Sequence, residues 1–240
     1  MDATATLKAG STDTPDMDTQ IYTSIRDAVL TQRLTSGSRL PELSLSKIYD
    51  VNRMMVRRTL ERLAADHIVV LRRNQSAVVA NPSATETRQV FNARRLVEAE
   101  VMRQTAGTIS KTTRAKIESV IAHEHAAHLD GSHDDRIHLS VGFHSLLAAA
   151  CPNHVLGEIL DELVLRTSIA VALYKVPGMA VCYRSGDHQG IAQALFDDDA
   201  DLAVKHTGEH LDYLEGCLNY ATRLQKMDLA SILAPMADAH

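Results

Sequence analysis

The sequence has no tryptophan and few aromatic residues, with three Phe and six Tyr among 240 residues. Glycine and proline are also scarce, at 11 and 6 copies, and Val, Ile and aromatic residues do not alternate over long runs. These shortages argue against an all-β fold. The hydrophobic and charged shares, 45% and 23%, are those of a globular chain, so wholesale disorder is excluded and one or two domains are expected.

Long hydrophobic runs are missing as well. No stretch of 18 apolar residues exists, so we expect no membrane span. Residues 1–17 combine one Lys with three Asp and have no apolar run, so we expect a flexible arm rather than a secretory signal. The three cysteines, Cys151, Cys182 and Cys217, lie far apart without a CxxC pair. This odd number favours reduced thiols in a cytoplasmic protein, each a small buried hydrophobic residue.

The net charge of −5 is unevenly distributed. Residues 18–82 carry ten basic and six acidic side chains, whereas residues 83–240 carry 14 basic and 21 acidic ones. A basic segment can meet a polyanion that an acidic segment repels. This pattern indicates a DNA-binding module followed by a larger module with another task, although so small an excess also arises by chance.

The order of elements predicted for residues 18–82 is that of a winged helix-turn-helix. Apolar residues recur at helical spacing over 20–35, with Thr19 as a possible N-cap, and a short helix is expected over 45–49. Asn52 can begin a third helix that runs to about Asp66. Two β-branched runs, 68–71 and 77–80, then predict a hairpin. In such a module the third helix enters the major groove of DNA.

Basic side chains lie on the third helix and the hairpin, the elements expected to contact DNA. Arg53 and Arg57 are four residues apart and share one helix face, and Arg58 follows. A guanidinium fork can pair with guanine or clamp a phosphate. Arg72 and Arg73 at the hairpin would reach the neighbouring backbone. A solvated basic helix face is the commoner reading of such a run, and the helix order together with the basic hairpin favours DNA.

Residues 20–80 resemble the DNA-binding region of GntR-family transcriptional regulators. The stretch SKIYDVNRMMVRRTLERLAADHIVV follows the family's recognition pattern, and Gly37 and Leu40 match its G-x-x-L turn. The resemblance implies sequence-specific DNA binding, and we include Asn52, which begins this helix, among the DNA-binding residues. The chain departs from the family pattern at several positions, which leaves the operator sequence open: Leu43, Asp50, Met55, Arg58 and Ser76.

Residues 83–222 are predicted to be entirely helical, in about six helices, with a loop at 175–183 and a C-terminal tail at 223–240. This region resembles the FCD effector domain of the FadR subgroup, in its VanR-like six-helix form. Three stretches carry the resemblance: SVGFHSLLAAACPNHVLGEIL, GDHQGIAQAL and VKHTGEHLDYL. The fold expected is therefore mainly α, with an N-terminal winged helix-turn-helix followed by an all-α helical-bundle effector and dimerisation domain.

The resemblance places His144, His188 and His210 at the family's metal-binding positions. Imidazoles from three helices can converge inside a bundle and leave open positions on a divalent transition metal, of which Zn²⁺ is the first expectation. The family's carboxylate ligand would lie four residues before His144, where this chain has Ser140. With 12 histidines in the chain, chance spacing is the alternative. Without metal, the same histidines would bind an anionic effector.

Cationic side chains are the candidates for holding an acidic effector, because one Arg can bind a carboxylate with two parallel hydrogen bonds. Arg94, Arg95 and Arg166 lie on helices that resemble those lining the family's pocket, and Ser140 joins them. The alternative is a surface ion pair, with Glu98 for Arg94 or with Glu162 for Arg166. Adjacent residues face different ways on a helix, so at least one of Arg94 and Arg95 is expected at the surface.

These features predict a ligand-responsive transcriptional regulator rather than an enzyme. We expect a homodimer that represses from an inverted-repeat operator in double-stranded DNA and leaves it when a small acidic metabolite binds the helical domain. A small metal-dependent hydrolase built on the three histidines is the alternative. It lacks support from any HExxH, GxSxG or phosphate-loop motif. A purely architectural DNA-binding protein would leave the acidic helical region without a task.

Overall fold

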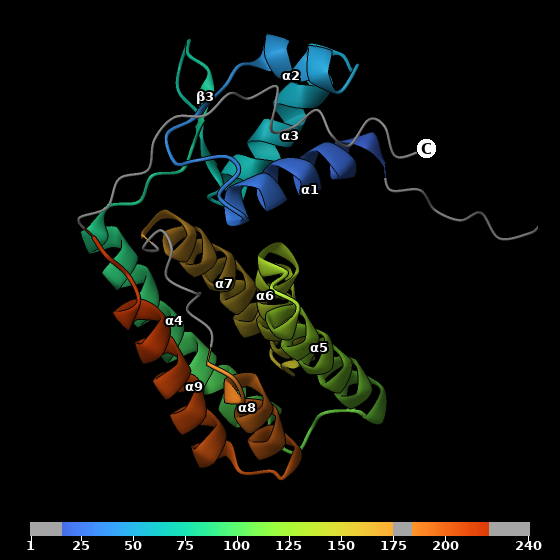
Figure 1. The fold of residues 1–240 in the computed structure, drawn as a ribbon, viewed down its shortest axis with the longest axis vertical. Coiled ribbons are helices and arrows are strands. Elements are labelled where there is room, and N and C mark those ends of the chain that lie inside the picture. Colours follow the sequence, from blue (N-terminus) through green and yellow to red (C-terminus); the bar gives the residue numbers. More distant parts are fainter. Residues whose placement is uncertain (1–15, 175–183, 221–240) are drawn as a thin grey trace, which may run out of the picture.

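The computed structural model describes residues 16–174 and 184–220. It shows a small α/β unit at one end of a larger helical bundle (Figure 1). This confirms the predicted fold, a winged helix-turn-helix followed by helices. Most of the predicted arm, the loop at 175–183 with Cys182, and the tail at 223–240 lie outside the described residues. No helix in the described ranges is long and apolar enough to cross a membrane.

The N-terminal unit has three helices and a small sheet. The helices are α1 (Met17–Leu30), α2 (Glu42–Ile48) and α3 (Arg53–Ala65), and the strands are β1 (Arg39–Leu40), β2 (Val69–Val70) and β3 (Ala77–Val79). β3 is central and antiparallel to both neighbours. β1 is absent from the prediction because a two-residue strand has no measurable periodicity.

The ends of two helices differ from the prediction. Asp16, not Thr19, caps α1, since its carboxylate accepts from the backbone N–H of Asp18. α2 begins at Glu42, directly after Pro41, so it starts three residues earlier than expected. The predicted start of α3 is confirmed, because Asn52 Oδ1 accepts from Met55 N at 2.9 Å. Val56, Leu60 and Leu63 of α3 are buried, as the apolar spacing predicts.

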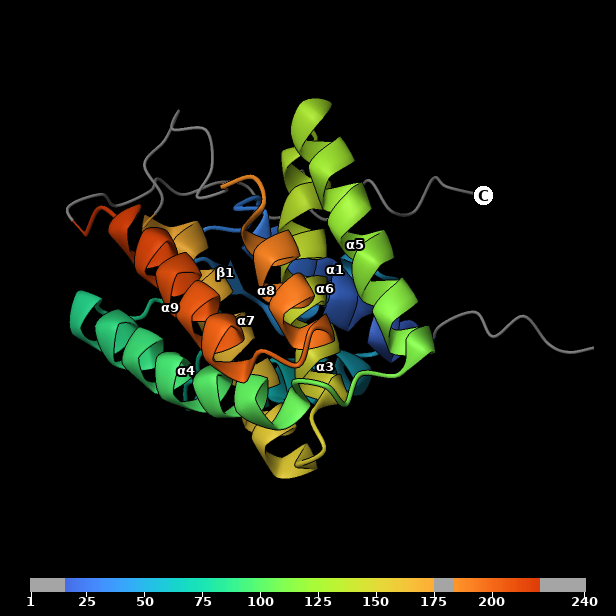
Figure 2. The same cartoon turned by 90° about the horizontal axis from the view of Figure 1, so that it is seen from below.

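The bundle consists of six helices over residues 84–216, as predicted. They are α4 (Ala84–Thr105), α5 (Lys111–Leu129), α6 (His133–Ala150), α7 (His154–Tyr174), α8 (Asp187–Phe196) and α9 (Ala200–Gly216). Seen from below, α4 and α9 lie side by side, and α8 lies between α9 and the α5–α6 pair (Figure 2). Their shared core includes Val101, Phe143, Leu160 and Ile191. α6, α8 and α9 each bring one of the three predicted histidines to it.

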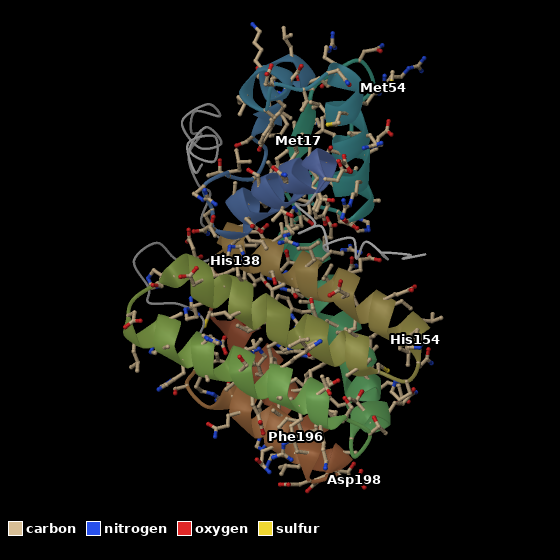
Figure 3. The ribbon with its side chains drawn as sticks, turned by 90° about the vertical axis from the view of Figure 1, so that its right-hand side faces the viewer. Met17, Met54, His138, His154, Phe196 and Asp198 are labelled. Atoms are coloured by element: carbon tan, nitrogen blue, oxygen red, sulfur yellow. The ribbon has the colours of Figure 1, made fainter. Side chains whose placement is uncertain are left out.

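The two units meet where α1 lies across the ends of α6 and α7 (Figures 1 and 3). Ile169 of α7 is 3% exposed and belongs to the apolar core of the N-terminal unit. His138 of α6, which Figure 3 labels at this junction, lies 3.8 Å from Asp27 of α1. His67 lies 3.1 Å from Glu162 of α7. The C-terminal end of α1 is thereby held beside the bundle.

Candidate DNA-binding surface, metal centre and effector cavity

Arg53 and Arg57 lie on the exposed face of α3, on the side that faces the hairpin. Their side chains are 65% and 71% exposed, and their ion pairs with Glu42 and Glu61 are at the surface. Surface pairs of this kind contribute little, so both guanidinium groups can exchange partners. Arg53, Arg57 and Arg72 line one groove of about 510 Å³ between α2, α3 and the hairpin. This basic groove is on the end of the molecule away from the bundle, where Figure 3 labels Met54.

The other predicted DNA-binding residues lie beside this groove. The side chain of Asn52 is used as the N-cap of α3. Arg58 points to the start of α1, with Nε 3.7 Å from Asp18 Oδ1. Arg73 is exposed in the turn of the hairpin. The structure therefore brings three of the six residues together in the groove and leaves the other three on its flanks.

The three predicted histidines converge in the core of the bundle. His144, His188 and His210 are 2%, 5% and 5% exposed, and one ring nitrogen of each lies within 4.8 Å of the others. His144 Nε2 and His210 Nε2 are 3.3 Å apart. Two nitrogens bound to one tetrahedral Zn²⁺ at about 2.0–2.1 Å would be separated by about 3.3 Å. The pair therefore already has the spacing of two ligands of one ion.

Each histidine is oriented by its own carboxylate. The Nδ1 atoms contact Glu98 Oε1 at 2.7 Å for His144, Glu124 Oε2 at 2.6 Å for His188, and Asp187 Oδ2 at 3.3 Å for His210. A carboxylate on one ring nitrogen fixes the tautomer and leaves the other nitrogen free to bind a metal. Among the described residues, the buried Nε2 of His188 has no hydrogen-bond partner. This unpartnered nitrogen is the observation that fits a metal ion.

Protonation supports the same assignment. Burial lowers the pKa of His210 to about 4 and that of His144 well below its usual value, with Arg94 adding to both effects. Burial raises the pKa of Glu98, but Arg94 and His144 outweigh this effect and hold the pKa of Glu98 well below its usual range. At neutral pH the imidazoles of His144 and His210 are therefore neutral and Glu98 is ionised, and neutral imidazole is the form that ligates a metal.

The sequence did not identify the three carboxylates as part of this site. The sequence predicts Glu98 only as a surface partner of Arg94, yet Glu98 is 0% exposed and Arg94 is 2% exposed. The i, i+4 spacing predicts the ion pair between Arg94 and Glu98, but the burial of the pair depends on the helices packed around α4. Asp187 is adjacent to the predicted His188, and Glu124 lies on α5, whose sequence carries no matching motif.

A cavity of about 210 Å³ lies next to this centre, at the junction of the two units. Arg94 and Ser140 both line it. Arg94 Nε donates to Glu98 at 2.7 Å and one terminal nitrogen donates to Thr167 at 2.6 Å. Among the described residues its other terminal nitrogen, Nη2, is buried without a hydrogen-bond partner. The Arg94–Glu98–His144 chain of contacts connects the cavity to the histidine cluster.

Arg95 and Arg166, also predicted to hold the effector, are not brought to this cavity. Arg95 pairs with Asp212 and Glu215 of α9 at the surface. Arg166 pairs with Glu162 and Glu86 and lines a different cavity, beneath the hairpin. Of the four predicted effector residues, the structure brings Arg94 and Ser140 together and separates the other two.

Comparison with known proteins agrees with this architecture. Residues 18–79 match the family described as bacterial regulatory proteins, gntR family, and residues 89–213 match the FCD domain. The HTH-type transcriptional repressor RspR of Escherichia coli K12 is 23% identical over 189 residues, which are 79% of this chain and 78% of that protein. The uncharacterized HTH-type transcriptional regulator YdfH of Escherichia coli O6:H1 matches to the same extent.

Two solved structures share the fold. The putative transcriptional regulator GntR from Rhodococcus sp. RHA1 superposes with a TM-score of 0.69 at 19% identity, covering 83% of this chain and 95% of that one. E. coli McbR/YncC superposes with a TM-score of 0.68 at 13% identity, with the same coverage.

A winged helix-turn-helix unit joined to an FCD helical bundle defines a DNA-binding transcriptional regulator. The chain belongs to the GntR family of bacterial regulatory proteins and carries an FCD domain. It is a regulator and not an enzyme, as predicted. The hydrolase alternative is not supported, because both matched regions and the relatives belong to regulators.

Proposed function

We propose that this regulator is a repressor that binds an inverted-repeat operator as a homodimer and leaves it when a small carboxylate enters the cavity lined by Arg94. The observation that carries the proposal is the buried Nη2 of Arg94, which has no hydrogen-bond partner among the described residues. An unpaired buried guanidinium nitrogen is costly, and a carboxylate is its natural partner. The similarity to a repressor supports the direction of regulation.

On the DNA side, Arg53 and Arg57 read base edges from the major groove while Arg72 and Arg73 contact phosphates. Arg58, at the flank of α3, is placed for a phosphate contact, and Asn52 fixes the start of the helix. One winged helix offers few base contacts, and a two-fold dimer doubles them on an inverted repeat. Dimerisation through the helical domain would set the spacing of the two half-sites.

In the helical domain, His144, His188 and His210 hold a divalent transition metal, Zn²⁺ in the first instance. Imidazole nitrogen suits zinc better than Mg²⁺ or Ca²⁺, and three nitrogen ligands leave at least one position open. The ion, when bound, supplies a positive charge and an open coordination position. Ser140 occupies the place of the family's carboxylate, so the effector's own carboxylate can fill that position and link effector binding to the metal.

The repressor proposal is tested by operator binding in the presence of defined carboxylates. Operator duplexes are first selected from random sequence with the full-length protein. Acetate, succinate and citrate are then titrated into the protein–DNA complex at fixed ionic strength. We expect at least one to weaken operator binding by about 5–150-fold, the usual range of allosteric coupling. Binding of a carboxylate without any change in operator affinity would contradict release by the effector.

The metal is tested by elemental analysis of protein purified without chelator. We expect about one zinc per chain in the parent, and a loss of it in His188→Ala, because His188 offers a buried free nitrogen. His154→Ala is the matched control, since His154 is exposed at the start of α7 and does not belong to the cluster (Figure 3). Absence of zinc from the parent, with no thermal shift when Zn²⁺ is added, would contradict a metal site and leave the three histidines as a buried polar cluster held by their carboxylates.

A further inference from the structure

The cavity lined by Arg94 is not confined to the helical domain. Leu30, Thr31 and Gln32, at the end of α1 in the DNA-binding unit, form part of its wall. The remaining lining residues come from α4, α6, α7 and α9. The cavity therefore borders both units of the chain.

We propose that Gln32 of the DNA-binding unit is a ligand-contacting residue that holds the carboxylate effector opposite Arg94. The inference rests on the proposed function and adds a residue, and a route of coupling, that the helical domain alone does not contain. The inference is supported by the side-chain nitrogen Nε2 of Gln32, which is buried and has no hydrogen-bond partner in the part of the chain that the structure describes.

Gln32 and Arg94, from two different units, thus line one cavity, and each has a buried nitrogen without a hydrogen-bond partner among the described residues. Arg94 Nη2 and Gln32 Nε2 are both buried, and Arg136, 3% exposed, adds a second guanidinium to the wall. Asp134 is the acidic residue among the lining residues, and it is exposed. A carboxylate has two oxygens, so one can accept from Arg94 and the other from Gln32. The chemistry recognised is a small organic acid that a volume of about 210 Å³ can hold.

The backbone at Gln32 does not explain why a glutamine is there. Its φ is +62°, in the left-handed region that favours glycine or asparagine over longer side chains. The turn is closed by the backbone, with Gln32 N donating to Val29 O at 3.1 Å and Leu34 N to Ala28 O at 2.7 Å. The backbone hydrogen bonds close this turn without any contribution from the glutamine side chain.

A ligand shared by Gln32 and Arg94 would fix the DNA-binding unit against the bundle. α1 and α3 are tied together, since Tyr22 OH of α1 donates to Asp66 Oδ2 at the end of α3 at 2.6 Å. Setting the angle of α1 therefore sets the direction of the recognition helix. A ligand that prefers one angle shifts the population towards it, and operator affinity changes accordingly.

The test compares three variants of the full-length protein with the parent. Gln32→Met keeps the length of the side chain and the demands on the backbone but removes the amide. Gln32→Glu places a second carboxylate opposite the ligand. Gln193→Met is the matched control, because Gln193 donates to Asp197 on the exposed side of α8 and does not line the cavity. Acetate, succinate and citrate are the probes, with affinity measured by calorimetry and operator affinity measured with and without saturating probe.

We expect Gln32→Met to bind the preferred probe about 3–10-fold more weakly, which is the equivalent of one hydrogen bond. The probe should also weaken operator binding less in this variant than in the parent. Gln32→Glu should reduce the affinity for the probe by more than about tenfold, because the carboxylates of the protein and the probe then repel each other. Gln193→Met should behave as the parent does.

Two results would overturn the inference, and they are distinguishable. If the parent responds to a probe and Gln32→Met binds and responds equally well, Gln32 has no part in the site and the repressor proposal stands. If the parent binds none of the three acids, the carboxylate site itself is refuted, and the proposed function falls with it.

Discussion

Arg94 is buried between Glu98 and the cavity that it helps to line. Its Nε holds Glu98, which orients His144, while its Nη2 faces no partner in the described chain. A change in the charge near Arg94 therefore reaches the histidine cluster through two contacts, at 2.7 Å each. The effector and the metal are expected to influence each other's affinity by the same factor.

Ser140 gives a direct way to test that link. Ser140→Asp should tighten zinc binding, because a carboxylate one turn before His144 supplies a fourth ligand. The same change should weaken citrate binding, since Ser140 lines the effector cavity and the new charge repels the acid. Zinc affinity is measured by competition with a chelating dye, and citrate affinity by calorimetry. Ser140→Asn, neutral and nearly isosteric with Asp, is the control and should do neither.

On the DNA surface, Arg57→Ala should weaken binding to the selected operator by about 1–3 kcal/mol and relax the choice of one base pair. Arg72→Ala should instead weaken binding to all DNA sequences alike and make the affinity less dependent on salt concentration. Fluorescence anisotropy at several salt concentrations separates the two effects. Arg103→Ala on α4, exposed and far from the groove, should leave DNA binding unchanged. Equal footprints for Arg57→Ala and the parent would refute the recognition-helix assignment.

At the scale of elements, the contact between α6 and α7 is unusually close. A Cβ added at Gly157 of α7 would clash with the carbonyl oxygen of Ala148 at the end of α6. The helices that carry His144 and the junction residue Ile169 are thus packed directly on each other. The position of the histidine cluster relative to the DNA-binding unit depends on this contact.

Gly157→Ala is therefore expected to destabilise the protein by about 1–3 kcal/mol, because the helices must separate to admit a methyl group. Gly208→Ala on α9 is the matched control, since a Cβ there has no atom within 4 Å. It should stabilise the fold by up to about 1 kcal/mol through helix propensity. Urea unfolding of both variants, with chelator present, gives the comparison. Equal stabilities for Gly157→Ala and the parent would contradict the close packing.

At the scale of the whole molecule, the buried histidines make the stability of the metal-free protein depend on pH. The pKa of His210 is lowered to about 4 by burial, and that of His144 is also lowered, against an ordinary value of 6.5. Below pH 6.5 the unfolded chain therefore takes up protons that the folded chain resists. This contribution to stability is full above pH 6.5 and declines as the pH falls towards 4.

Thermal melting of chelator-treated protein between pH 7.5 and 4.5 should thus show a falling Tm. His210→Gln, which cannot take up a proton, should show a shallower fall. A Tm that rises over this interval, or an identical slope in the variant, would contradict the burial of a neutral imidazole. Added zinc should raise the Tm at pH 7.5 and lose this effect on acidification, because protonated imidazole cannot ligate.

Periodicity along the chain predicts the helices of the N-terminal unit, the start of the third helix at Asn52 and the six bundle helices, because helical spacing is a local property of the sequence. The choice of His144, His188 and His210 rests on the resemblance of three short stretches to the FCD domain. The burial of Glu98 beneath His144, the ion pairs of Arg95 and Arg166 with acidic partners, and the place of Gln32 in the cavity wall emerge only when distant segments pack together. Burial and the meeting of distant segments depend on how helices pack, and no spacing within one helix contains that information.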